Sequence, residues 1–282
     1  MITQEEKKAI LRSMSLMDDA LFTKCFGESK ACTEVLLRVI LNKRDLCVID
    51  VHPQRWIENI ISHSVKLDVM AVDLDGTIYD IEVQKETKGA SRRRARYYSF
   101  MMDADMLDKG TGFDSLPDSF IIFITSGDAL GRGEAIYHVE RKVEETGESF
   151  GDGLEIIYVS SSLTKPETEL GWLMEDLKCT DPEKMHYNAI KERTEFLKLE
   201  KEGIAIMSSM FDEVLKREKE TSWNDGKLEG KLEGKQEGVI KGKLDMTKSM
   251  LADGFLPLSK IAEYSGLSLE EVKNIKQSLS VS

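Results

Sequence analysis

Acidic and amide side chains interrupt two short β-rich segments in the first third of the chain. Asp68 lies in the first segment, and Glu82 and Gln84 lie two residues apart in the second. Successive side chains of a strand point to opposite faces, so Glu82 and Gln84 share one face. The Asp-Gly pair at 75–76 favours a tight turn between the segments. A hairpin about this turn would bring Asp68 close to Glu82.

Two convergent carboxylates suit a hard divalent cation such as Mg²⁺, which prefers oxygen ligands. A bound cation would activate a water molecule and stabilise negative charge at a phosphate under attack. A basic segment follows directly, because residues 86–100 carry one lysine and four arginines against a single glutamate. Carboxylates beside a basic helix are what cleavage of a phosphodiester needs. The side chains expected to contact DNA are Lys88, Arg92, Arg93 and Arg96.

Hydrophobic periodicity predicts the elements that position these groups. Apolar residues at helical spacing indicate a helix around 33–41, and alternation indicates a hairpin of strands about the turn at 73–76. The remaining predictions are a helix over 91–107, strands over 120–125 and 154–159, and a loop or extended hairpin over 127–153.

This order of elements and motifs resembles the PD-(D/E)XK nuclease superfamily, and within it the transposase or recombination-promoting nuclease family. The resemblance covers residues 20–160 well and the tail loosely. It implies an α/β fold with a restriction-endonuclease-like core, in which helices flank a central mixed β-sheet, plus a C-terminal helical region. The segments that carry it are Phe22–Gly27, Leu36–Leu41, Lys66–Asp68, Ile81–Gln84 and Arg93–Tyr98.

The resemblance also implies roles for single residues. Asp68 and Glu82 would be metal ligands, and the backbone carbonyl of Val83 would supply another oxygen. Gln84 occupies the position of the superfamily's catalytic lysine. Glu34 matches an acid of the family's N-terminal helix, which would join the metal shell through water. The expected cofactor is Mg²⁺ or another divalent cation, and the expected substrate is DNA.

The sequence departs from the superfamily pattern at two positions. Leu67, and not proline, precedes Asp68. Gln84 carries no positive charge, so it can orient water or phosphate but stabilises a transition state less than lysine would. Lys85 is predicted to point to the opposite face of the strand, so we do not expect it to take the place of the superfamily's catalytic lysine.

Composition divides the chain into four parts. Residues 1–162 form the predicted nuclease-like core, and residues 163–225 form a charged helical region. Residues 226–245 repeat a glycine every fourth position, which predicts a tether or a closely packed helix. Residues 246–282 resemble a small helix-turn-helix module that could bind DNA or protein. The helical tail could also form the interface of a homodimer.

The overall charge limits how the chain can meet nucleic acid. It has 282 residues and a formal net charge of −12, which argues against a surface that coats DNA. Weak, salt-sensitive binding confined to one groove is expected. The longest apolar runs are far shorter than a membrane-spanning helix. Four scattered cysteines and an N-terminus without a secretory pattern favour a cytoplasmic protein.

Three functions therefore remain open. The favoured one is metal-dependent DNA endonuclease activity of the transposase or DNA-recombination type. The first alternative is a catalytically silent relic of the nuclease fold that binds DNA or protein. The second is a haloacid-dehalogenase-type phosphatase that uses Asp73 and Asp75, since the run 69–77 resembles the first motif of those enzymes. It lacks the helix that a parallel crossover would need after this motif.

Overall fold

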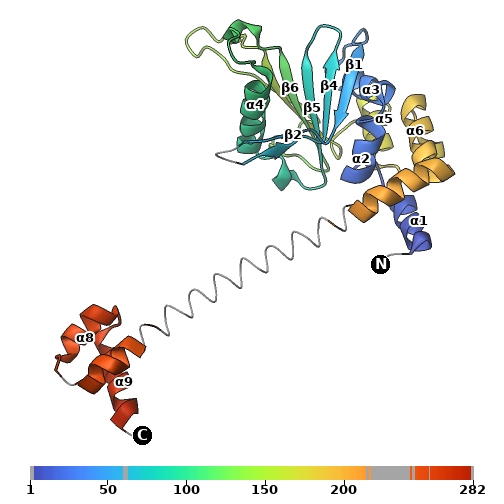
Figure 1. The fold of residues 1–282 in the computed structure, drawn as a ribbon. Coiled ribbons are helices and arrows are strands. Elements are labelled where there is room, and N and C mark those ends of the chain that lie inside the picture. The colour runs from blue at the N-terminus through green and yellow to red at the C-terminus, as the bar shows by residue number, and fades with distance from the viewer. Residues whose placement is uncertain are drawn as a thin grey trace. The chain divides into compact units, whose positions relative to one another are not determined.

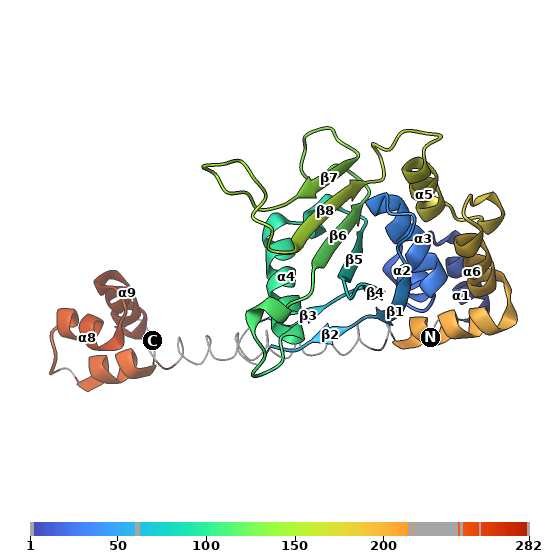
Figure 2. The ribbon, with the colours of Figure 1, turned by 90° about the horizontal axis from the view of Figure 1, so that it is seen from above.

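A mixed β-sheet forms the centre of the first part of the chain (Figures 1 and 2). Within the described residues it has six strands in the order β1-β4-β5-β6-β8-β7, and a separate ladder joins β2 to β3. The strands are β1 (Val48–Pro53), β2 (Trp56–Ile57), β3 (Val65–Lys66), β4 (Val69–Asp73), β5 (Ile78–Gln84), β6 (Ser119–Thr125), β7 (Ile136–Val139) and β8 (Leu154–Ser160).

The structure is a computed structural model that describes residues 3–59, 63–213, 216, 242, 245–253 and 255–280. The chain divides into two units, Met1–Phe211 and Asp212–Ser282. None of the described helices is both long enough and apolar enough to cross a bilayer.

Helices cover both faces of the sheet, as Figure 2 shows. Helix α4 (Arg92–Met106) lies on one face, whereas α2, α3, α5 and α6 gather on the other side. Residues 201–213 are also helical. The other helices of this unit are α1 (Gln4–Ser13), α2 (Asp19–Phe26), α3 (Lys30–Leu41), α5 (Glu169–Lys178) and α6 (Asn188–Leu199), with short 3₁₀ turns η1 (Thr87–Gly89), η2 (Phe113–Ser115) and η3 (Pro182–Lys184).

Strand β5 separates two apolar cores because its side chains alternate between the faces. Tyr79, Ile81 and Val83 pack into the core shared with α1, α2, α3, α5 and α6. Ile78 packs into the second core, which lies under α4 and includes Ala95 and other residues of that helix. Because α5 and α6 contribute buried residues to the first core, the helical region after the sheet packs against the same core as the N-terminal helices.

The predicted hairpin and basic helix are confirmed. Strands β4 and β5 pair antiparallel, with Val69 opposite Ile81. Gly76 has a φ of 83° in the connecting turn, a conformation that favours glycine. Helix α4 begins after Ser91, whose hydroxyl accepts a hydrogen bond from the Arg94 backbone N–H at 3.2 Å.

The strands predicted over 120–125 and 154–159 are confirmed as β6 and β8, which run parallel to each other and to β5. The stretch 127–153 contains β7, which pairs antiparallel with β8 and is the edge strand on that side of the sheet. The predicted α/β core with a mixed sheet between helices, followed by C-terminal helices, is therefore confirmed.

The second unit contains a helical segment over 245–253, followed by α8 (Leu258–Ser265) and α9 (Leu269–Ser280). Ile261 and Val272 are buried between its helices. Gly266 ends α8 with a φ of 64°, and Ser268 and Glu271 form a capping box at the start of α9. Most of the glycine repeat over 226–245 lies outside the described residues.

Candidate metal and nucleic-acid site

Asp68 lies where the chain passes from the small ladder into the main sheet. Strand β3 pairs with β2, whereas β4 pairs with β1 and β5, so the residues between β3 and β4 belong to neither ladder. The Asp68 backbone N–H donates to Glu82 Oε1 at 2.9 Å, and the Val83 N–H donates to Asp68 Oδ2 at 3.2 Å. The predicted proximity of Asp68 and Glu82 is thus confirmed.

A third acid, Asp80, shares the α4-facing side of β5 with Glu82 and was not singled out from the sequence. Asp80 is completely buried, and neither carboxylate oxygen has a hydrogen-bond partner. Its strand neighbours are Met70 and Ile121, both in the apolar core under α4. The alternation of polar and apolar residues in this strand would predict that Asp80 faces solvent. It is buried because α4, which is distant from it in the pattern of the strand, packs over this face of the sheet.

Arg94 supplies the positive charge next to Glu82. Its Nη2 lies 2.8 Å from Glu82 Oε2 and 2.7 Å from the Tyr98 hydroxyl, and its Nη1 donates to the Gly89 carbonyl at 3.0 Å. The guanidinium carbon lies 5.9 Å from the centre of the Phe123 ring. The run of basic residues over 92–96 does not predict this contact, because it depends on which side of α4 faces β5.

The pKa values of the three acids are raised. Burial, followed by the negative charge of Glu82 and of Asp19, raises the pKa of Asp68 to about 8. Burial also raises the pKa of Glu82 to about 7, although the Asp68 N–H and Arg94 oppose the shift. Burial beside the other two carboxylates raises the pKa of Asp80 well above its ordinary value. Perturbed acids gathered in one place are typical of functional sites.

This donor set fits a divalent cation by its chemistry. If ionised, Asp68, Asp80, Glu82 and Arg94 together would carry two negative charges, in a place where burial disfavours charge. A hard cation with oxygen ligands would compensate that charge. In the described part of the chain, no group of three or more His, Cys, Asp or Glu side chains is arranged to hold a metal. Asp68 and Glu82 would therefore need backbone or water oxygens to complete a shell.

The acid expected from the N-terminal helices lies elsewhere. Glu34 is half-buried on α3, where its carboxylate accepts from the Val48 N–H at 2.9 Å and pairs with Arg38 at 2.8 Å. Instead, Asp19 in the first turn of α2 is close enough to raise the pKa values of both Asp68 and Glu82. In the sequence, the only feature that marks Asp19 is its place in the Asp18-Asp19 pair at the start of this helix.

Gln84 and Lys85 leave β5 on opposite sides, as predicted. Gln84 faces Gly89, where an added Cβ would overlap with Gln84 Oε1. Lys85 forms an ion pair with Asp18, which precedes α2 on the other side of the sheet. Lys85 is therefore engaged away from the carboxylates, whereas Arg94 contacts Glu82.

The basic residues predicted to meet DNA are exposed. Lys88 lies in η1, and Arg92, Arg93 and Arg96 lie in the first turns of α4. Arg92 also lines a pocket between α4 and the β7–β8 edge. These side chains therefore surround the helix end from which Arg94 reaches Glu82.

Asp73 and Asp75, the residues that a haloacid-dehalogenase-type phosphatase would use, lie at the turn between β4 and β5. Asp73 is buried, and its Oδ1 accepts from the backbone N–H groups of Asp75 and Thr77 at 3.0 and 2.9 Å. Its Oδ2 accepts from the Tyr79 hydroxyl at 2.7 Å. The following strand pairs antiparallel without a crossover helix. Asp73 thus has a structural role that explains its position.

Comparison with known proteins agrees with this arrangement. A family model described as PD-(D/E)XK nuclease family transposase matches residues 16–222, which include the whole sheet and both of its helical layers. No curated protein and no solved structure gives a significant match. Since the matched region spans most of the chain and contains the Asp68–Glu82 pair, the chain belongs to the PD-(D/E)XK nuclease family transposases.

Proposed function

We propose that this protein is a divalent-metal-dependent DNA endonuclease, with Mg²⁺ as the expected cation. The observation that carries the proposal is that Asp68 donates its backbone N–H to the carboxylate of Glu82, on the α4 face of β5, and that both acids have raised pKa values. Family membership supports a nuclease-type function. The basic end of α4 beside the pair supports DNA as the substrate.

Each residue has a proposed part in the reaction. A bound cation would lower the pKa of a water and neutralise charge on the phosphate. Asp68, Glu82 and the Val83 carbonyl would hold it, and Gln84 would orient the water or a phosphate oxygen. Arg94 favours the ionised form of Glu82, which a metal ligand must adopt.

DNA would be held by the exposed charges around the start of α4. Lys88, Arg92, Arg93 and Arg96 come from η1 and α4, next to Arg94. Because the whole chain carries a net charge of −12, this local contact should be weak at physiological salt and strongly dependent on ionic strength. Glu34 remains a lesser candidate, since its oxygens already bind Val48 and Arg38.

Nicking of supercoiled plasmid tests the proposal. The purified full chain should convert supercoiled DNA to open circles with Mg²⁺ and not with EDTA. Asp68→Asn and Glu82→Gln should each lower the rate by about 10³-fold or more, a size seen when groups that stabilise the transition state are removed. Asp75→Asn is the matched control, because Asp75 is an exposed acid in the turn of the same hairpin. Release of phosphate from small phosphomonoesters that requires Asp73 would contradict the nuclease proposal.

A second candidate function rests on Gln84. Without a lysine at this position the fold could bind DNA or protein without cutting. Binding of duplex DNA by the unmutated chain, with no nicking under any divalent cation, would establish this function instead.

Assembly and biological role stay predictions. One proposed site per chain would cut one strand, so cleavage of both strands would favour a homodimer, which we expect to form through the C-terminal helical tail. Light scattering of the full chain and of a chain shortened before the glycine repeat would test this. Cytoplasmic location and a role in DNA recombination are likewise expectations.

A further inference from the structure

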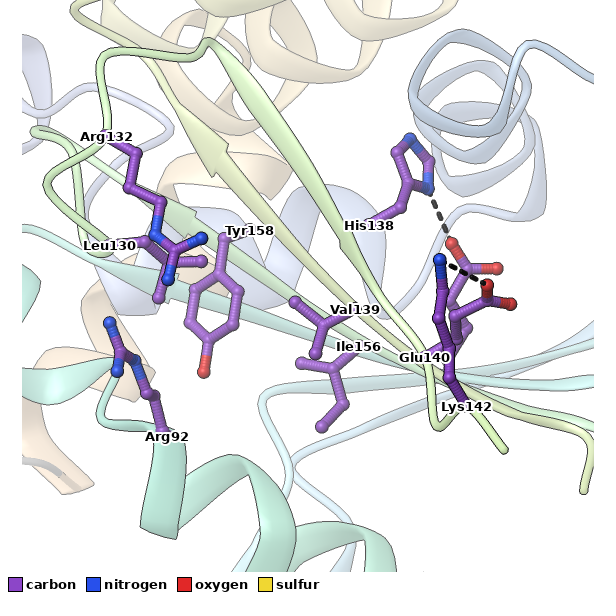
Figure 3. A pocket seen from close by; sticks show the side chains of 10 residues that line it. Arg92, Leu130, Arg132, His138, Val139, Glu140, Lys142, Ile156 and Tyr158 are labelled. Carbon is purple, nitrogen blue, oxygen red and sulfur yellow. Dashed lines mark hydrogen bonds and ion pairs between the residues drawn. The ribbon is translucent and has the colours of Figure 1, made fainter. Parts of the chain in front are cut away.

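A charged pocket lies beyond the start of α4, and Tyr158 and Ile156 line it from the same face of the sheet as Asp80 and Glu82. It has a volume of about 680 Å³ and opens between α4 and the β7–β8 edge. Arg92 and Arg132 enter it from different segments and lie around Tyr158, as Figure 3 shows. Leu130 and Ile156 form part of its apolar wall.

The two arginines differ from the other charged residues of the pocket. His138 Nδ1 lies 2.5 Å from Glu155, and Lys142 Nζ lies 3.9 Å from Glu140 (Figure 3). Among the described residues, the guanidinium groups of Arg92 and Arg132 have no hydrogen-bond or ion-pair partner. Arg92 and Arg132 are therefore available to a ligand, and together with Lys142 they outnumber the pocket's two glutamates, Glu140 and Glu155, by one charge when His138 is neutral.

The loop that carries Arg132 is tied down by Asp128. The Asp128 carboxylate accepts from the backbone N–H groups of Gly131 and Gly133 at 2.8 and 2.7 Å, and from the Tyr137 hydroxyl at 2.8 Å. The Arg132 N–H donates to the same hydroxyl at 3.1 Å. A loop held in this way presents its arginine with little ordering left to do on binding.

Tyr158 adds an unused polar group between the two arginines. Only 3% of this residue is exposed, and its hydroxyl has no hydrogen-bond partner. A buried hydroxyl without a partner costs free energy that a ligand acceptor would recover. Guanidinium groups and a hydroxyl are all donors, so the ligand that fits is an anion with several acceptor oxygens, such as a phosphate.

The pocket is aligned with the carboxylate pair across the sheet. Glu82 lies opposite Phe123 on β6, and Phe123 lies opposite Tyr158 on β8. Neighbouring strands are about 4.8 Å apart, so Tyr158 is roughly 10 Å from Glu82 along this row. A distance of this size lies within a few nucleotides along one DNA strand.

We propose that this pocket binds a backbone phosphate of the DNA strand that enters the carboxylate site, close to the phosphate to be cleaved. Arg92 and Arg132 hold the phosphate oxygens, the Tyr158 hydroxyl donates to one of them, and the apolar wall contacts the sugar. This inference rests on the proposed action on DNA, and it adds Arg132 and Tyr158 to the residues that position the substrate.

Binding of a short fluorescent DNA duplex in EDTA tests the pocket without requiring cleavage. Arg132→Ala should weaken binding about 10-fold at low salt and reduce the slope of log affinity against log salt by about 0.9, the value for one lost phosphate contact. Arg141→Ala is the matched control: Arg141 lies just after β7, whereas Arg132 lies just before it, and Arg141 forms an ion pair with Asp152 and does not line the pocket. Equal affinities and slopes for both variants would overturn the inference.

Tyr158→Phe provides an independent measurement that leaves the fold intact. Removal of an unpaired buried hydroxyl should not lower the melting temperature of the free protein, yet it should weaken DNA binding by about 3- to 10-fold, since a hydrogen bond to a charged group is lost. Unchanged DNA binding by a stably folded Tyr158→Phe protein would contradict the proposed donor.

Failure of the pocket and failure of the proposed nuclease function give different results. If Arg132→Ala and Arg141→Ala bind DNA alike while nicking still needs Asp68 and Mg²⁺, the pocket is wrong and the nuclease stands. If no nicking occurs but Arg132→Ala weakens binding as described, the pocket stands and the protein is a DNA-binding relic.

Discussion

The two faces of β5 have opposite chemistry although they belong to one strand. On one face, Tyr79, Ile81 and Val83 are buried among apolar side chains of the N-terminal and C-terminal helices. On the other, Asp80 and Glu82 are equally buried but lie beneath α4. One face lowers the free energy of the folded state through apolar burial, whereas the other raises it by placing carboxylates out of water.

This difference explains how the fold can hold a strained site. The apolar face and the parallel pairing with β6 fix the strand, so the acids on the opposite face cannot move apart to reach solvent. Their pKa values are raised as a result. A bound cation would relieve this electrostatic strain.

The largest stability effect is expected on the apolar face. Ile81→Ala should lower the free energy of unfolding by about 2–5 kcal/mol, because it leaves a cavity in a fully buried core. Urea denaturation measures the change. Leu74→Ala, at an exposed position in the hairpin turn, is the control and should change stability little. A loss below about 1 kcal/mol at Ile81 would mean that this face is not the scaffold.

Removal of the Arg94 guanidinium, on the opposite face, should have a pH-dependent effect in the lower part of that range. Arg94→Met leaves Glu82 buried without its partner, which should cost about 3 kcal/mol at pH values where Glu82 is ionised. The pKa of Glu82 should rise further above about 7, so the loss should be smaller at lower pH. Denaturation at two pH values measures this, with Arg93→Met as the exposed control. A loss independent of pH would contradict the account.

Stability of the metal-free protein should fall as pH rises. The folded-state pKa values of Asp68 and Glu82, about 8 and about 7, lie above the ordinary values near 4. The folded chain therefore holds protons that the unfolded chain has lost, and the associated stability disappears as pH rises through these values. Mg²⁺ should raise the melting temperature by several degrees above pH 8 and little at pH 5. A melting temperature insensitive to Mg²⁺ across this range would argue against a metal site.

The smallest effect is expected at Lys85. Its ion pair with Asp18 is largely exposed, so Lys85→Ala should change stability by less than about 1 kcal/mol. Plasmid nicking should stay within about twofold of the unmutated protein. A large loss of nicking would mean that Lys85, and not Gln84 or Arg94, supplies the group that the superfamily lysine provides.

Much of the fold could be predicted from the sequence because its signals are local. The hairpin with Asp68 and Glu82 follows from alternation and an Asp-Gly turn, and the helix predicted over 91–107 is found as α4. The roles of Asp80, Arg94 and Asp19 depend on which element covers which face, and a single strand or helix pattern does not contain that information. The same reason explains why no sequence pattern points to Asp19, whereas Glu34 was expected from the family resemblance.

The central claim is that the polar face of β5 binds a divalent cation through Asp68 and Glu82. Calorimetric titration of the full chain with Mn²⁺ at pH 7, repeated in two buffers of different ionisation enthalpy, tests it most directly. The account predicts saturable binding with release of protons, because acids with raised pKa values must ionise to coordinate a cation. It also predicts loss of binding in Asp68→Asn and its retention in Asp75→Asn. Equal Mn²⁺ binding by the Asp68→Asn protein and the unmutated chain, or no binding by either, would contradict it.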